Sequence, residues 1–408
     1  MKFKDYPISK AIKSQISEMG WNRPTDIQFK AIKPILEGED VLAIAQTGTG
    51  KTASFVIPSL QLIQDDLKKN NVHFVRCLVM VPTRELAVQI QEVYELLGKK
   101  TEIRILSLLG GVEQDRQINE LERGVDVVIS TPGRLFDLAA QGYLKLDKLK
   151  ILVLDEADHM LALGFIKDIR DLMRHIPQKR QTLFFSATIT KEIKKIAYDL
   201  VRNAIRIQIS PKNPVAKNIE HAVAFIEMDD KRFFLENIIK ENEERKIMVF
   251  VRTKVRAERV VKAMERVAIR AKTIHGDIDQ NERFAILDEF KTGKLKVLIS
   301  TDVASRGIDI PGVEAVVNYD MPENPENYVH RVGRTGRGKE KGVAISFCSE
   351  DEVPYLEDIE EYTGEEITVY DLSKSDYQSI ILDTDDESND WKRLIEDEQK
   401  RTGNKNEW

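Results

Sequence analysis

The stretch Ile151-Leu152-Val153-Leu154-Asp155-Glu156-Ala157-Asp158 joins an apolar run directly to neighbouring carboxylates. A short apolar run of this kind is typical of a strand buried in a parallel sheet. The sequence therefore predicts a pair of carboxylates, Asp155 and Glu156, at the carboxyl end of a buried strand. The acidic first turn of a helix is the alternative explanation, because Asp and Glu favour that position.

A glycine-rich segment about a hundred residues upstream follows another apolar run, residues 41–44. Gly48 and Gly50 allow a tight turn whose backbone amides face an anion, and the helix that follows adds its N-terminal dipole. Lys51 would reach the outer phosphates as a point charge, and the Thr52 hydroxyl would bind magnesium. A plain turn between a strand and a helix is the alternative. We expect nucleotide contacts from Thr47, Gly48, Thr49, Gly50, Lys51 and Thr52.

The two segments together predict a nucleoside triphosphatase that uses Mg²⁺. Asp155 would hold the magnesium ion. Glu156 points elsewhere and can orient and polarise the attacking water. Asp158 is better placed for a contact between elements than for chemistry. Lys51, Asp155 and Glu156 are thus the predicted catalytic residues of this part of the chain.

Length, composition and charge narrow the class of protein. The chain has 408 residues, of which 42% are hydrophobic, and a formal net charge of -6. Nucleic acid would therefore have to bind at local sites rather than through bulk charge. Cys77 and Cys348 lie far apart in apolar runs, which indicates buried thiols in a reducing compartment. Without a signal peptide or an apolar run of about 18 residues, we expect a cytoplasmic protein without membrane segments.

Strand-like runs alternate with helical patterns, which predicts the α/β class with doubly wound parallel sheets. The first predicted strands are residues 76–81, 103–108, 125–129, 151–154 and 182–185. Pro211 and Pro214 then indicate a linker. The alternation restarts with predicted strands at residues 222–226, 247–251, 271–274, 297–299, 315–317 and 343–347. The predicted domains are a first lobe at 1–208, a linker at 209–218, a second lobe at 219–370 and an acidic, disordered tail at 371–408.

The second lobe carries an arginine-rich segment, His330-Arg331-Val332-Gly333-Arg334-Thr335-Gly336-Arg337-Gly338. Arg334 and Arg337 are three residues apart, so one helical turn would place them on the same face. Arginines offered by one lobe to a phosphate held by the other act as arginine fingers, which stabilise charge on the transferred phosphoryl group. A solvated basic helix face is the alternative explanation.

These motifs resemble those of DEAD-box RNA helicases of the short bacterial type, from about Phe3 to about Val369. The resemblance implies two RecA-like lobes with ATP and Mg²⁺ as cofactors. Residues 20–28 resemble the Q motif, in which Gln28 would read the adenine edge, with Phe3 as the isolated upstream aromatic. Asp309 would face the nucleotide. The resemblance also implies coupling of hydrolysis to strand separation through Ser186, Thr188, Asp158 and His330.

The resemblance further implies sequence-independent contacts to the RNA backbone from both lobes. The expected RNA contacts are Pro82, Thr83, Arg84, Gly111, Thr131, Arg134, Thr253 and Thr301. Residues 82–84 and 131–134 follow strands at loop-to-helix junctions, where amides, hydroxyls and arginines can hold phosphates. Helix caps are the alternative for the threonines.

Two residues that follow the acidic tetrad, Asp155-Glu156-Ala157-Asp158, depart from the family pattern. His159 stands where arginine is common, and Ala162 stands where aspartate is common. We interpret His159 as a surface residue of a helix.

Three functions are compatible with these residues. The first is a monomeric ATP-dependent RNA helicase, which couples ATP hydrolysis to local duplex unwinding and RNA release. The second is an ATP-gated RNA clamp or chaperone with little unwinding. The third is a DNA helicase or translocase of the same two-lobed superfamily, against which the motif around Gln28 and the tetrad from Asp155 weigh. We predict the first.

Overall fold

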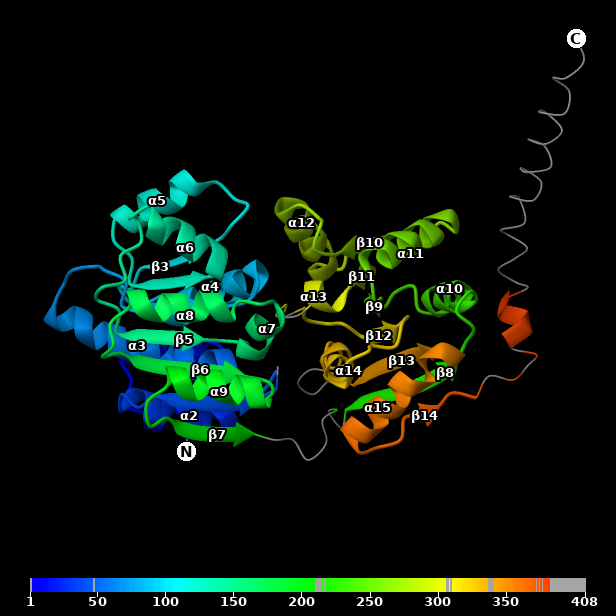
Figure 1. Cartoon of the computed structure of the whole chain (residues 1–408), viewed down its shortest axis with the longest axis horizontal. Helices are drawn as coiled ribbons and strands as arrows, with labels where there is room; N and C mark the ends of the chain where they lie inside the picture. The colour runs from blue at the N-terminus through cyan, green and yellow to red at the C-terminus, as the bar shows by residue number, and fades with distance from the viewer. Residues whose placement is uncertain are drawn as a thin grey trace, which may run out of the picture. The chain divides into compact units, whose positions relative to one another are not determined.

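The computed structural model describes residues 2–46, 48–209, 215, 218–305, 308, 310–336, 341–371, 373, 375 and 377–381. The chain divides into two compact units, each built around its own sheet (Figure 1). The first unit contains the described residues up to Ile209 together with Ile308, and the second contains the rest.

The first unit is a parallel seven-stranded sheet in the order β3-β4-β2-β5-β6-β1-β7. Its strands are β1 (Val41–Ala45), β2 (Cys77–Met80), β3 (Ile105–Leu108), β4 (Val127–Ser130), β5 (Ile151–Leu154), β6 (Gln181–Ser186) and β7 (Ile205–Ile209). Its helices are η1 (Phe3–Asp5), α1 (Lys10–Glu18), α2 (Asp26–Leu36), α3 (Lys51–Lys69), α4 (Arg84–Gly98), α5 (Gln114–Glu122), α6 (Pro132–Ala140), α7 (Ala157–Ala162), α8 (Ile166–His175) and α9 (Lys191–Leu200).

Helices cover both faces of this sheet, which explains the apolar runs in its central strands. In β5, Val153 packs into the core under α1 to α4, while Leu152 and Leu154 pack into the core under α6 to α9. Both faces of the strand are therefore buried, so every position must be apolar rather than every second one.

The second unit repeats this arrangement, with a parallel seven-stranded sheet in the order β10-β11-β9-β12-β13-β8-β14. Its strands are β8 (Ile219–Phe225), β9 (Ile247–Phe250), β10 (Ala271–Ile274), β11 (Val297–Ser300), β12 (Ala315–Asn318), β13 (Gly342–Cys348) and β14 (Thr368–Val369). Its helices are α10 (Lys231–Glu241), α11 (Lys254–Arg266), α12 (Gln280–Lys291), α13 (Asp302–Ser305), α14 (Pro325–Val332), η2 (Glu350–Glu352) and α15 (Val353–Thr363). Each strand has a counterpart at the same place in the first sheet.

The predicted fold class is confirmed: both sheets are parallel and doubly wound. The predicted strands all exist, with ends shifted by a few residues, and Cys77 and Cys348 are buried in β2 and β13. The edge strands β7 and β14 were not predicted. Their side chains are largely exposed, so they lack the continuous apolar run that marked the other strands.

The structure describes only part of the expected linker and tail. Residues 210–214, 216–217 and 382–408 lie outside the described residues. Within the expected tail, however, the Tyr377 ring packs 4.8 Å from that of Phe234, and its hydroxyl donates to Asp230 Oδ2 at 2.8 Å. The packed part of the second unit thus extends beyond the expected start of the tail at residue 371. None of the described helices is long and apolar enough to cross a membrane.

Candidate active site

The residues after β1 form a tight turn that leads into α3. Gly48 and Gly50 have φ angles of +78° and +91°, in the left-handed region that favours glycine. A β-carbon at Gly50 would also come within 2.5 Å of Gln28 Nε2. The Thr49 hydroxyl donates to the Gln46 carbonyl at 2.7 Å and closes the turn. Thr47 lies outside the described residues.

Lys51 is the first residue of α3, and its side chain is buried. Its Nζ has no hydrogen-bond partner within the part of the chain that the structure describes. A buried ammonium group without a partner is costly, so its position at a helix N-terminus beside a glycine turn suits an anionic ligand. Thr52, the next residue, is half-buried.

Asp155 follows β5 directly and is 2% exposed. Burial raises the pKa of its carboxyl group to about 6; the charge of Lys51 opposes this shift, while Glu156 adds to it. The Glu156 backbone N–H donates to Asp155 Oδ1 at 3.0 Å. The structure therefore brings together the predicted phosphate-binding lysine and the predicted metal-binding aspartate.

Glu156 is the N-cap of α7 and has a φ angle of +51°, a left-handed conformation that is uncommon for a residue with a side chain. Its Oε2 lies 3.4 Å from His159 Nδ1. His159 is only 4% exposed, so its interpretation as a surface residue is wrong. The reason is that the short helix α7 packs against β6 and α9, which buries this side of the helix.

Asp158 joins α7 to the loop after β6. Its Oδ2 accepts hydrogen bonds from the backbone N–H groups of Ala187 and Thr188, both at 3.2 Å, and from the Thr188 hydroxyl at 3.4 Å. The Ser186 hydroxyl donates to the Thr188 carbonyl at 2.8 Å. The residues expected to couple the first lobe's elements are therefore in direct contact.

Gln28 and Phe3 are both buried, at 5% and 4% exposure. Gln28 Oε1 accepts from Thr25 N at 3.0 Å, and Nε2 donates to the Gly50 carbonyl at 3.2 Å. The Gln28 amide thus contacts the glycine turn that precedes α3. The sequence did not predict this contact. The Phe3 ring packs 6.5 Å from the Trp21 ring, in the core of the first unit.

Two further loops lie at the carboxyl ends of strands in the first sheet. The Arg84 guanidinium covers a glycine turn: a β-carbon at Gly111 would lie 2.8 Å from Arg84 Nη1. Thr83 Oγ1 accepts from Leu86 N at 3.3 Å, so it caps α4 as the alternative explanation proposed, and Pro82 before it is buried.

Arg134 lies in the first turn of α6, after the loop that follows β4, and its side chain is 10% exposed. Its Nη2 donates to the Val112 carbonyl at 3.3 Å, while Nη1 is buried and has no partner among the described residues. Thr131 precedes α6 but makes no side-chain cap bond within the described residues. A phosphate could satisfy both groups.

In the second unit, Thr253 is exposed and caps α11 by accepting from Arg256 N at 3.2 Å. Thr301 is half-buried between β11 and α13. Asp302 beside it accepts from Arg331 Nε at 2.6 Å and from Arg331 Nη2 at 2.8 Å. This bidentate ion pair ties α14 to α13.

The arginine-rich segment differs from its prediction. α14 ends at Val332, so Arg334 lies beyond the helix and does not share a helical turn as expected. Arg334 is 4% exposed, and its Nε donates to the His330 carbonyl at 3.2 Å, which excludes a solvated basic face for this residue. Arg337 and Asp309 lie outside the described residues. Sequence reasoning missed the structural role of Arg331, because its partner Asp302 is 29 residues away.

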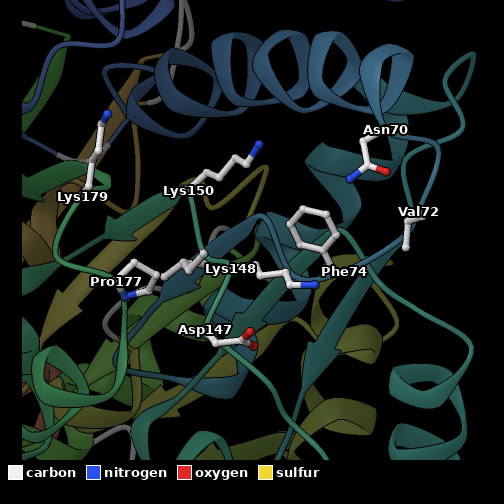
Figure 2. Close-up of a pocket in the computed structure, with 9 residues that line it drawn as sticks. Asn70, Val72, Phe74, Asp147, Lys148, Lys150, Pro177 and Lys179 are labelled. Atoms are coloured by element: carbon white, nitrogen blue, oxygen red, sulfur yellow. The ribbon is translucent and has the colours of Figure 1, made fainter.

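The first unit also has a pocket at the opposite end of the strands from this site. Figure 2 shows this pocket of about 500 Å³, where the Phe74 ring lies among lysine side chains. The lining residues Phe74, Lys150 and Lys179 precede β2, β5 and β6, so the pocket lies at the amino ends of the strands. It is therefore separate from the site that contains Lys51 and Asp155.

The fold and the site define a class: an α/β phosphate-loop nucleoside triphosphatase unit followed by a second unit of the same topology. Residues 25–196 match the DEAD/DEAH box helicase family, and residues 230–339 match the helicase conserved C-terminal domain. The chain belongs to the DEAD-box family of helicases.

Similar proteins support this assignment over nearly the whole chain. The chain is 41% identical to the ATP-dependent RNA helicase CshA of Listeria monocytogenes, over 89% of this chain and 69% of that protein. It is 39% identical to the ATP-dependent RNA helicase DbpA of Bacillus subtilis, over 90% of this chain and 75% of that protein. The structure matches S. cerevisiae Dbp5 bound to RNA and ADP BeF3 with a TM-score of 0.82 at 31% identity, over 93% of this chain and 98% of that one.

Proposed function

We propose that this protein is an ATP-dependent RNA helicase, an RNA-stimulated ATPase that couples ATP hydrolysis to local duplex unwinding and RNA release. The observation in the structure that carries the proposal is the buried Lys51 ammonium group, which has no partner among the described residues and lies beside Asp155. The membership of the DEAD-box family and the RNA helicases among its relatives support the choice of RNA.

The nucleotide phosphates would bind the amides of the turn at Gly48 to Gly50 and the Lys51 ammonium group. Thr52 and Asp155 would hold Mg²⁺, because hydroxyl and carboxylate oxygens suit this ion. A bound cation would favour the ionised carboxylate of Asp155 and so offset the rise in its pKa that burial causes. When bound, the ion neutralises charge on the phosphates.

Glu156 would orient and polarise the attacking water. Gln28 would contribute to the choice of base. Its amide uses one N–H and one oxygen lone pair on the protein, on Gly50 and Thr25. One N–H and one lone pair remain, and this pair matches the donor and acceptor of the adenine edge. Phe3 would contact the base only through the small part of its ring that remains exposed.

RNA would bind through its backbone. In the first unit, Pro82, Thr83, Arg84, Gly111, Thr131 and Arg134 are the proposed contacts, and in the second unit they are Thr253 and Thr301. The partnerless Nη1 of Arg134 supports a phosphate contact there, within the limits of the described residues. Contacts of this kind position RNA without reading its sequence, while ribose 2′-OH groups distinguish it from DNA.

Arg334 and Arg337 remain proposed arginine fingers, Asp309 a proposed nucleotide contact, and His330 a proposed coupling residue. In the first unit, a change at the nucleotide could reach the RNA-binding loops through Asp158, because this residue holds the loop from Ser186 to Thr188.

ATPase assays with RNA and with DNA of the same sequence test the proposal. We expect RNA to stimulate hydrolysis strongly and DNA to stimulate it little. Equal stimulation by DNA would contradict the choice of RNA. Unwinding of a short RNA duplex under excess ATP then separates a helicase from a clamp, because a clamp would hold RNA and release little single strand.

A further inference from the structure

His159 lies where it can act on the proposed catalytic carboxylate. It follows Glu156 by one turn of α7, and its Nδ1 lies 3.4 Å from Glu156 Oε2. A carboxylate can only accept a hydrogen bond, so Nδ1 is the donor in this contact. The His159 ring is buried, so the packing around it limits its movement.

The other ring nitrogen of His159 adds no hydrogen bond to the fold among the described residues. Nε2 of His159 is buried and has no hydrogen-bond partner in the described parts of the chain. A buried polar atom without a partner destabilises the folded state relative to an apolar side chain of similar size. Leucine or methionine would fill this space without that cost, so the benefit of the histidine must lie elsewhere.

The Glu156 main chain is constrained as well. Its φ angle of +51° and the hydrogen bond from its N–H to Asp155 Oδ1 set the direction in which the side chain leaves the backbone. The contact with His159 Nδ1 restricts rotation about the side-chain bonds at the carboxylate end, where the chemistry occurs.

We propose that His159 is a positioning residue, which holds the Glu156 carboxylate in the orientation from which it polarises the attacking water. A general base must meet its proton at hydrogen-bond distance and angle, so small losses of orientation lower the rate of hydrolysis. The inference rests on the proposed function of Glu156 and adds a residue that flanks the acidic tetrad.

Three substitutions in the full-length protein test the role, with kcat and KM for ATP measured at saturating RNA. His159→Asn places an amide nitrogen near the position of Nδ1, His159→Gln places one near Nε2, and His159→Leu removes both. We expect His159→Leu to lower kcat by about ten-fold, a fraction of the roughly 10²–10⁴ that a general base supplies, with little change in KM. His159→Asn should recover most of kcat, and His159→Gln should resemble the leucine variant.

Thermal unfolding distinguishes positioning from a structural role. His159→Leu should have an unchanged or higher Tm, because it removes a buried atom without a partner, and His175→Leu, at an exposed histidine of α8, is the matched control. A lower Tm with equal loss of kcat in all three variants, or wild-type kcat in His159→Leu, would overturn the inference. Glu156→Gln is measured in parallel: if it is active, the proposed role of Glu156 fails, whereas if it is inactive beside a fully active His159→Leu, only the role of His159 fails.

Discussion

The two units have the same topology, yet they use the same lysine position in opposite ways. β1 and β8 occupy the same place in their sheets, and the helix that follows each begins with a lysine, Lys51 in α3 and Lys231 in α10. Lys51 Nζ has no partner among the described residues. Lys231 Nζ donates to the carbonyls of Tyr319 at 2.9 Å and Phe347 at 3.1 Å and pairs with the Glu352 carboxylate.

The connecting loops explain the difference. The first unit has a glycine turn at 48–50, whereas residues 226–230 of the second unit contain three acidic residues and no glycine. Such a loop cannot turn its amides toward a phosphate, and its charge repels one. In the second unit the Glu352 carboxylate takes the place that an anionic ligand would occupy. A shared fold therefore does not imply a shared site, because the site depends on which group pairs with the lysine side chain.

The largest effect is expected when the first lysine is removed. Lys51→Ala should lower kcat for ATP hydrolysis by roughly 10² or more, because the variant loses the positive charge that would face the phosphates. The fold should remain intact, since no described group depends on Lys51 Nζ for a hydrogen bond. Steady-state ATPase assays and thermal unfolding measure the two outcomes. An active Lys51→Ala variant would show that the lysine is not part of the site.

Removal of the second lysine, Lys231, should affect the stability of the fold rather than catalysis. Lys231→Ala removes the buried ammonium partner of Glu352 and leaves that carboxylate to Arg252, so we expect a loss of up to about 3 kcal/mol in the free energy of unfolding. Denaturant unfolding measures this loss. The double variant Lys231→Met with Glu352→Leu should recover part of the stability, because it removes both fully buried charges and leaves the partly exposed Arg252 to Glu323. Equal stability of wild type and Lys231→Ala would contradict the assignment of this pair.

In the first unit, the Gln28 side chain joins the glycine turn to the proposed base contact. Gln28→Ala should erase much of the preference for ATP over GTP, by roughly 1–3 kcal/mol, the usual discrimination of a bidentate contact to a base. Competition between ATP and GTP in ATPase assays measures it. Gln15→Ala is a matched control, because Gln15 is also buried and its amide donates to Glu18 rather than to the loop. Efficient GTP hydrolysis by the wild type would contradict the role of Gln28.

The smallest effect concerns the end of the second unit. A chain that ends at residue 370 should keep its ATPase activity, because all the proposed site residues precede it. It should lose about 1–2 kcal/mol of stability in the second unit, because the Tyr377 ring and hydrogen bonds are removed. A chain that ends at residue 381 should match the full-length protein. Tyr377→Ala should reproduce the loss of stability. Tyr370→Ala is the matched control, because Tyr370 is exposed.

The sequence was sufficient for the central strands and for the motifs of the first unit. Central strands such as β5 were predicted because burial on both faces leaves a continuous apolar run. The short edge strand β14 carries no such signal, and its pairing with β8 depends on residues far away in the chain. The end of α14 was also missed, because Gly333 and Gly336 do not by themselves tell how far a helix continues.

By itself the sequence determined the α/β class, the two repeated units, the glycine turn before Lys51 and the carboxylates after β5, because these follow from local periodicity and from short spacings along the chain. Only the tertiary structure decided that His159 is buried against Glu156, that Arg331 is bound to Asp302, and that Lys231 is neutralised by Glu352. The last pair joins residues 121 positions apart, so no local pattern could reveal it. Folding brings such partners together, and the partner decides whether a buried charge is left for a ligand or is used within the protein.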